Sequence, residues 1–219
     1  MTSRRLRALL RYFPPYRRLY DIGTDHALLP IAAWEAGLID DCRGVDNKPG
    51  PLEQARQNLT QYPKAPITPV LADGLEALDA SRDLIVFAGV GGQTIHEVIA
   101  KGPLHDVKRM VFQPTMHAHR VRALTDYINW HIVDETVVEE ADRHYPIIVM
   151  EPGKTRLTLH EKRFGPVLLK NREPAFLAML TREKAHLEAL IEKLPKHVDA
   201  TEFTEELAAI KEVLDNDPR

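Results

Sequence analysis

Short runs of apolar residues alternate with longer amphipathic segments from about residue 18 to residue 151. The short runs predict buried strands, and the longer segments, with apolar residues three or four apart, predict helices. The predicted strands are 18–22, 42–46, 67–70, 83–88, 109–113, 131–139 and 145–151, and the predicted helices are 3–12, 27–37, 51–59, 92–101 and 117–129. This alternation is typical of βαβ units. Because no helix separates the last two strands, we expect a mostly parallel, seven-stranded, doubly wound α/β sheet that ends in an antiparallel hairpin.

The pattern changes after Pro152 and Gly153, where long charged stretches with helical periodicity begin. Apolar residues recur there at near-heptad spacing, at Leu177, Leu180, Leu187, Ile191 and Leu194, and again at Phe203, Leu207, Ile210 and Leu214. Lys184 occupies a position in this seam that should be apolar, so we expect the helices to splay there or to pack on the main domain. The chain is therefore predicted to have an α/β domain over 1–153 and a coiled-coil-like helical hairpin over 154–219.

Composition narrows the classes of protein to consider. The chain is 44% hydrophobic and 28% charged, and no apolar run approaches the roughly 18 residues of a membrane helix, so we expect no membrane partner. Cys42 is the only cysteine, which excludes an internal disulfide and favours a reducing, cytoplasmic location. The basic start of the chain lacks the apolar core of a secretory signal. The strand predicted at 18–22 also follows too soon for a removable leader.

Positive charge gathers at the start of the chain, although the net charge is only −3. The first 18 residues hold no acidic residue and six arginines, namely Arg4, Arg5, Arg7, Arg11, Arg17 and Arg18. Such a cluster predicts contacts with nucleic-acid phosphates, with Arg120 and Arg122 as a second, lesser patch. The alternative is that these arginines simply form a solvated helix face.

The most informative motif is Asp21-Ile-Gly-Thr-Asp-His26, which lies between the first predicted strand and the helix that follows it. Gly23 permits a tight turn and the close approach of a ligand at the carboxyl end of the strand, where such sheets bind nucleotides. The neighbouring acidic residues would repel a pyrophosphate but suit a cationic sulfonium cofactor. The alternative is an ordinary turn capped by Asp25.

Three later strand ends carry related features. Asp46 ends the second strand, where a carboxylate can accept hydrogen bonds from both hydroxyls of a ribose. Asp73 follows the third strand, and Gly89, Gly91 and Gly92 follow the fourth, where a backbone without side chains would let a flat base meet a methyl donor. Each feature alone is also compatible with a simple turn or cap.

The ordered segments DIGTDH, VDNKPGPLEQA, ADGL, AGVGGQTI and FQPTMHAHRVRAL closely resemble the bacterial family that methylates N1 of adenine 22 in tRNA, commonly called TrmK. The resemblance covers the α/β part nearly end to end, and the predicted hairpin is similar to that family's coiled-coil extension. It implies a Rossmann-like class I methyltransferase fold, S-adenosyl-L-methionine as cofactor and tRNA as partner.

The resemblance also implies roles for individual residues. Asp21, Gly23, Asp25 and His26 would line the methionine side of the cofactor, Asp46 the ribose, Asp73, Gly74 and Leu75 the adenine, and Gly89, Val90, Gly91 and Gly92 the floor beneath the methyl group. Gln113 joins Arg4, Arg5, Arg7, Arg11 and Arg120 among the expected RNA contacts. Three positions depart from the family pattern, because Val90 replaces Met, Thr115 replaces Asn and Pro146 replaces Glu. Thr115 lacks an amide that would orient a base, which leaves the acceptor open.

The expected methyl transfer depends more on the in-line position of adenine N1 against the sulfonium than on a strong general base, because N1 carries its own lone pair. Carboxylates would stabilise the positive charge that develops on the base, with Asp25 as the first catalytic candidate and Asp21 as the second. The target nucleotide must open or flip out of the folded tRNA before it can react.

Other functions compete with this interpretation. They are methylation of another RNA site or of a small molecule, cofactor binding without transfer, and a Rossmann dehydrogenase. A metal site is not expected, because His117 and His119 lie two residues apart and would not share a helix face. The sequence leaves the oligomeric state open.

Overall fold

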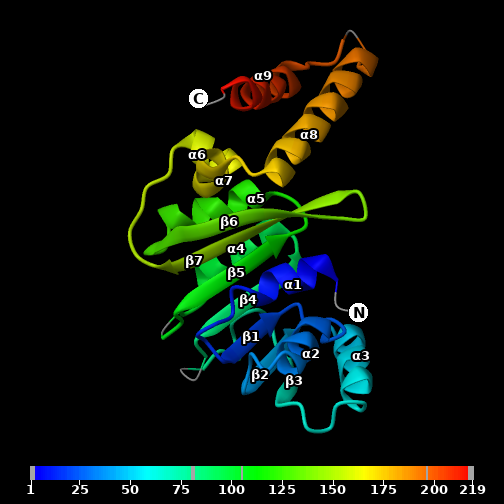
Figure 1. Cartoon of the computed structure of the whole chain (residues 1–219), viewed down its shortest axis with the longest axis vertical. Coiled ribbons are helices and arrows are strands. Elements are labelled where there is room, and N and C mark those ends of the chain that lie inside the picture. Colours follow the sequence, from blue (N-terminus) through cyan, green and yellow to red (C-terminus); the bar gives the residue numbers. More distant parts are fainter. Residues whose placement is uncertain (1–2, 80–81, 105, 196, 217–219) are drawn as a thin grey trace. The chain divides into compact units, whose positions relative to one another are not determined.

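A seven-stranded sheet forms the centre of the larger of two compact units in the computed structural model (Figure 1). The structure describes residues 3–79, 82–104, 106–195 and 197–216. The strands are β1 (Arg18–Ile22), β2 (Asp41–Asp46), β3 (Ile67–Leu71), β4 (Leu84–Val90), β5 (Arg109–Pro114), β6 (Trp130–Glu140) and β7 (Arg143–Pro152). Their order in the sheet is β3-β2-β1-β4-β5-β7-β6. Strands β1 to β5 are parallel and β7 pairs antiparallel with both neighbours, so the predicted Rossmann-like sheet is confirmed.

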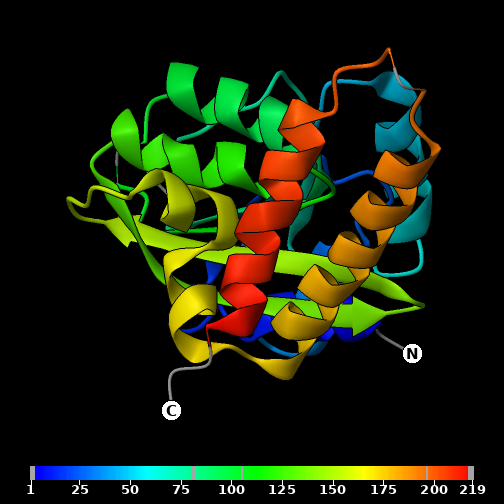
Figure 2. The ribbon, with the colours of Figure 1, turned by 90° about the horizontal axis from the view of Figure 1, so that it is seen from above.

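Helices cover both faces of the sheet, and each face has its own apolar core. The first core includes residues of α1 (Arg4–Leu10), α2 (Leu28–Glu35) and α3 (Pro49–Leu59). The second includes residues of α4 (Gly92–Lys101), α5 (Ala118–Arg122) and η1 (Ala123–Asp126), and Figure 2 shows α4 and α5 side by side. Because both faces are covered, β4 reads as a continuous apolar run, with Leu84, Ile85, Val86 and Phe87 all fully buried.

One predicted helix differs from the structure. The segment 117–129 is not a single helix, because α5 ends at Arg122 and a short 3-10 helix, η1, continues to Asp126. The Arg122 side chain turns into the protein interior at this point, and Thr125 donates a hydrogen bond to the Arg122 carbonyl over 2.9 Å.

The segment that follows the sheet belongs to the first compact unit, which spans Met1–Val167. It contains α6 (Leu159–Phe164), which begins with a capping box formed by Thr158 and Glu161, and the start of α7 (Pro166–Asn171). Phe164 is buried, and the carbonyls of Lys162 and Arg163 accept hydrogen bonds from Arg122. The first compact unit therefore extends beyond residue 153, and the division of the chain into a Rossmann-like domain over 1–153 and a helical hairpin over 154–219 stays a prediction.

The second compact unit, Leu168–Arg219, is a pair of helices, α8 (Pro174–Lys193) and α9 (Thr201–Asp215), which lie side by side (Figure 2). Leu180, Leu187 and Ile210 of the predicted seam are buried. Arg172 donates to the carbonyls of Val213 and Leu214, and therefore caps the end of α9 from a position just before α8. Along the described chain, no helix is long and apolar enough to cross a membrane.

Candidate functional site

Several loops meet at one edge of the sheet, because parallel strands end at the same edge. A cavity of about 130 Å³ opens among the loops that follow β1, β2, β3 and β4. Five of the predicted cofactor contacts line this cavity, namely Gly23, Asp46, Asp73, Gly74 and Val90. The structure therefore brings together residues from four strand ends that are far apart in the sequence.

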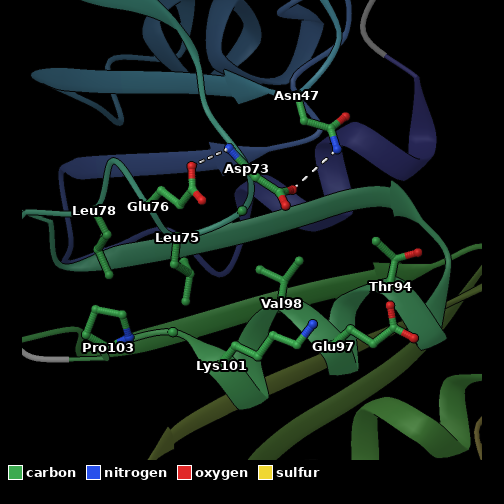
Figure 3. Close-up of a pocket in the computed structure, with 12 residues that line it drawn as sticks. Asn47, Asp73, Leu75, Glu76, Leu78, Thr94, Glu97, Val98, Lys101 and Pro103 are labelled. Atoms are coloured by element: carbon green, nitrogen blue, oxygen red, sulfur yellow. Dashed lines mark hydrogen bonds between the residues drawn. The ribbon is translucent and has the colours of Figure 1, made fainter.

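A second cavity, of about 540 Å³, shares Asn47, Asp73, Gly74, Thr94 and Val98 with the first and so adjoins it. Figure 3 shows its lining. The side-chain amide of Asn47 donates to the Asp73 carboxylate over 3.3 Å, and Leu75 and Val98 provide apolar surface. A flat aromatic base with a polar rim fits this combination, because apolar side chains can pack on its faces while a carboxylate accepts a hydrogen bond from its edge.

Two glycines of this edge cannot be replaced without distortion. Gly23 has φ +75°, and a Cβ atom there would lie 2.9 Å from Val90 Cγ2. Gly74 has φ +56°, and its Cβ would lie 2.6 Å from Val98 Cγ1. Both residues combine a left-handed backbone with close approach of a neighbour, which only glycine tolerates.

The loop that holds Asp25 and His26 is folded tightly beside Gly23. Asp25 (φ 47°) and Ala27 (φ 56°) are both left-handed, which is uncommon for residues other than glycine and often accompanies a functional site. Asn58 of α3 donates to the His26 carbonyl over 2.9 Å and so supports the loop. The side chains of Asp25 and His26 remain accessible, 3.6 Å apart, and neither lines the two cavities.

Asp21 lies buried on β1, directly before this loop. Asp21 is only 2% exposed, and its Oδ1 atom has no hydrogen-bond partner among the described residues. Burial raises the pKa of Asp21 to about 7 and the charge of Asp46 raises it further, while the neighbouring Thr24 acts in the opposite direction. Asp21 is therefore easily ionised if a cation approaches, which suits a ligand that carries positive charge.

The glycine-rich segment after β4 is paired with the segment after β5. The Thr115 amide donates to the Val90 carbonyl, and the Gly92 amide donates to the Met116 carbonyl, each over 3.0 Å. A Cβ at Gly92 would lie 2.3 Å from the His117 carbonyl oxygen, so only glycine permits this contact. A Cβ at Gly89 would meet nothing within 4 Å, so the backbone there borders open space.

Residues 19–216 match the family model described as TrmK: tRNA (adenine(22)-N(1))-methyltransferase. The chain belongs to the TrmK family. The match spans both the sheet and the C-terminal helices.

Individual TrmK-family relatives agree with this assignment. The tRNA (adenine(22)-N(1))-methyltransferase of Bacillus subtilis (strain 168) is 27% identical over 98% of this chain and 97% of its own length. The structure of Streptococcus pneumoniae Sp1610 in complex with S-adenosyl-L-methionine has a TM-score of 0.88 and 33% identity, and covers 98% of this chain and 100% of that one. The M. capricolum TrmK structure with S-adenosyl-homocysteine, 23% identical over 98% of both chains and with a TM-score of 0.85, supports the fold.

S-adenosyl-L-methionine is the cofactor of TrmK proteins, and the residues of this edge fit it. Asp46 and Asp73 offer carboxylates to hydroxyl and amino hydrogens, Gly23 leaves space that a side chain would fill, and the unpartnered oxygen of Asp21 suits a cation. In the described part of the chain, no group of three or more His, Cys, Asp or Glu is placed to hold a metal ion.

The N-terminal arginines of this TrmK chain fall into two groups. Arg4, Arg7 and Arg11 are exposed, and the Arg5 guanidinium lies 5.1 Å from the centre of the Tyr145 ring. The amide of Arg4 donates to Glu140 at the end of β6, which places the start of α1 near the carboxyl edge of the sheet. By contrast, Arg17 and Arg18 pair with Asp40 and Asp83 at the opposite edge, and these ion pairs account for their charge.

The second arginine patch requires a correction. Arg120 is exposed on α5, but the Arg122 side chain is only 3% exposed and forms an ion pair with the fully buried Glu135. Arg122 is therefore a structural residue, and the prediction that it contacts phosphate is wrong. Its two-residue offset from Arg120 on a helix turns it to the opposite face.

Gln113, the remaining predicted RNA contact, is fully buried at the end of β5. Its Nε2 atom donates to the Pro114 carbonyl over 3.2 Å, whereas its Oε1 atom has no hydrogen-bond partner. An unsatisfied buried acceptor is costly, so a donor that arrived with a ligand would be stabilised there.

Sequence analysis missed several residues of the site, namely Asn47, Asn58, Thr94, Val98 and Met116. Two of them had a recognisable signal, because Thr94 and Val98 are four residues apart on the helix that follows the glycine run and therefore share one face. Asn58 had no such signal, because it lies 32 residues from His26 in the sequence and only the fold brings the two residues together.

Proposed function

We propose that this chain transfers a methyl group from S-adenosyl-L-methionine to N1 of adenine 22 in tRNA. The observation that carries the proposal is the cavity that joins Gly23, Asp46, Asp73 and Val90 at the carboxyl edge of the sheet, in a chain of the TrmK family. When bound, the cofactor supplies an electrophilic methyl group. We expect the enzyme in the cytoplasm, because tRNA is modified there.

Each end of the cofactor has its own residues in this proposal. The Asp46 carboxylate accepts hydrogen bonds from the ribose hydroxyls, and Asp73 binds the adenine amino group while Leu75 packs on the ring. Asp21 and Gly23 lie at the methionine end, together with the backbone of the loop that holds His26. The segment from Gly89 to Gly92, including Val90 and Gly91, forms the floor below the methyl group.

Asp25 is the proposed catalytic carboxylate. Its left-handed backbone and exposed side chain hold a negative charge two residues after Gly23, where the base and the donor would meet. Methylation of N1 places positive charge on the adenine, and a nearby carboxylate stabilises that charge as it develops. Asp21 is the second candidate for the catalytic carboxylate. Because Asp21 is buried, however, a contact with the cofactor is its more direct role.

Gln113 is proposed to recognise the exocyclic amino group of the target adenine. Its unpartnered Oε1 atom would accept a hydrogen from the adenine N6 atom. Guanine has an oxygen at the same position. That oxygen would face the glutamine oxygen with no hydrogen to share, so guanine would be rejected. Because Gln113 is fully buried, this contact requires that entry of the nucleotide uncovers the side chain.

The exposed Arg4, Arg7 and Arg11 and the partly buried Arg5, all near the start of the chain, are proposed to bind tRNA phosphates, with Arg120 as a further contact. Such contacts offset the free energy that is needed to expose the target base, on the order of a few kcal/mol. Arg17, Arg18 and Arg122 are excluded from this surface because acidic partners hold them.

A methyl-transfer assay tests the proposed function directly. Radiolabelled cofactor is incubated with tRNA transcripts that carry either adenine or guanine at position 22, and the label should appear only with adenine. Transfer to neither transcript, together with a thermal shift by S-adenosylhomocysteine, would instead indicate a binding protein without transfer activity. Protection by NAD alone would overturn the choice of cofactor.

A further inference from the structure

Met116 presents a large apolar side chain to solvent beside the methyl-transfer floor. It is 61% exposed, on the turn that follows β5. Its backbone carbonyl accepts the Gly92 amide over 3.0 Å, so its position is tied to the glycine-rich segment. A single exposed apolar residue is common on protein surfaces, but Met116 lies directly beside the glycine-rich floor, where an incoming nucleic acid would meet it.

The turn that carries Met116 is held rigidly. Thr115 donates to the Val90 carbonyl on one side of it, and His117 adopts a left-handed conformation, with φ 57°, on the other. The close contact between the His117 carbonyl and Gly92 leaves no room for a side chain at position 92. The apolar side chain therefore projects from a preorganised turn and not from a mobile loop, so little conformational entropy is lost when it binds.

We propose that Met116 is a wedge that enters the base stack of the tRNA at the place that adenine 22 leaves when it flips. This inference rests on the proposed function and deepens it. Methionine is among the apolar side chains that proteins insert between stacked bases, and a side chain that fills the vacated space stabilises the opened state of the stem. The exposed Arg120, on α5 four residues after Met116, can bind a phosphate of the same strand. Met116 is thus a positioning residue, which acts on the target nucleotide through the stem.

The test uses the full-length protein and two tRNA transcripts. In the first, adenine 22 faces its normal partner nucleotide, and in the second the opposite nucleotide is changed so that adenine 22 is already unpaired. Met116→Ala should lower kcat/KM for the paired substrate by roughly tenfold or more, and for the unpaired substrate by at most about twofold, because the second base needs little opening. Met116→Leu should keep most of the activity on both transcripts.

A second readout reports the opening itself. With 2-aminopurine in the position next to adenine 22 and S-adenosylhomocysteine present, the wild-type protein should raise the fluorescence of the probe as the stack opens, and Met116→Ala should lose most of that increase. Leu159→Ala is the matched control, because Leu159 is also an exposed apolar residue, 84% accessible, but lies after the end of β7, away from the floor.

The outcomes separate the two hypotheses. An equal loss on paired and unpaired substrates, or no loss on either, would overturn the wedge while leaving the proposed function intact. If the wild-type protein methylates neither transcript, the proposed function fails instead. A loss of fluorescence in Leu159→Ala equal to that in Met116→Ala would also overturn a specific role for Met116.

Discussion

Arg122 and Glu135 form an ion pair in the interior of the sheet unit, with 2.6 Å between Nε and Oε1. The same guanidinium donates to the carbonyls of Lys162 and Arg163. The second carboxylate oxygen of Glu135 accepts the amide of Val167 over 3.1 Å. This pair therefore connects α5 and β6 to the segment that follows the sheet.

Loss of one partner of this pair should destabilise the protein strongly. Glu135→Gln leaves the Arg122 charge buried without compensation, and we expect the free energy of unfolding to fall by roughly 3–5 kcal/mol. Denaturant unfolding followed by circular dichroism measures the change. Arg17→Gln serves as control, because it breaks an exposed ion pair with Asp40 and should leave the midpoint nearly unchanged. An unchanged midpoint in Glu135→Gln would contradict the structural role of the pair.

Asp21 should make stability depend on pH. Burial raises its pKa in the folded protein to about 7, above the value of 3.8 for an unperturbed carboxyl. The folded state therefore binds more protons than the unfolded state between about pH 4 and pH 7, and this group lowers stability as the pH rises through that window and has no further effect above it. Asp21→Asn removes the ionisable group, so it should raise the melting temperature at pH 8 and leave it nearly equal to wild type at pH 4.

Melting curves of both proteins without cofactor, taken at several pH values, check this expectation. A stability difference between Asp21→Asn and wild type that stays constant from pH 4 to pH 8 would contradict it. The pH dependence of cofactor affinity is an independent test, because a cationic ligand favours the ionised carboxylate of Asp21. Wild-type affinity for S-adenosyl-L-methionine should therefore weaken below pH 7, while the affinity of the variant should change little.

Asp25 should affect turnover more than cofactor binding. Asp25→Asn retains the shape of the side chain but removes the charge, and we expect kcat to fall by about 10²–10³ with a nearly unchanged Kd for the cofactor. Single-turnover methyl transfer and isothermal calorimetry measure the two quantities. Asp106→Asn is a matched control, because Asp106 is also exposed and left-handed, with φ 64°, but precedes β5 at the other edge. Equal losses in kcat and affinity would make Asp25 a binding residue.

The exposed arginines of α1 should determine how tRNA binding responds to salt. Replacement of Arg4 and Arg7 by Gln should weaken binding and lower the slope of log affinity against log salt concentration by about 1 for each phosphate contact removed. Filter binding between low and moderate salt measures the slope. The matched double variant at Arg17 and Arg18 should keep the wild-type slope, since Asp40 and Asp83 already neutralise those residues. Identical slopes for all three proteins would exclude α1 from the tRNA interface.

Local sequence patterns are sufficient to predict the architecture and the cofactor edge. Buried strands are apolar whatever their partners are, so the seven strands could be predicted from local pattern alone. The positions of Gly23, Asp46 and Asp73 at successive strand ends were sufficient to predict one shared cavity, because parallel strands end at one edge of a sheet. The spacing of Thr158 and Glu161 is that of a capping box and marks the start of α6.

The charged and polar side chains that are available to a ligand could not be predicted in the same way. Arg120 and Arg122 are equivalent in sequence, but a carboxylate on β6 holds the second inside the protein. The burial of Gln113 and the exposure of Met116 depend on neighbours contributed by other elements. Availability depends on contacts between residues far apart in the chain, and local sequence pattern carries no information about which of those contacts form.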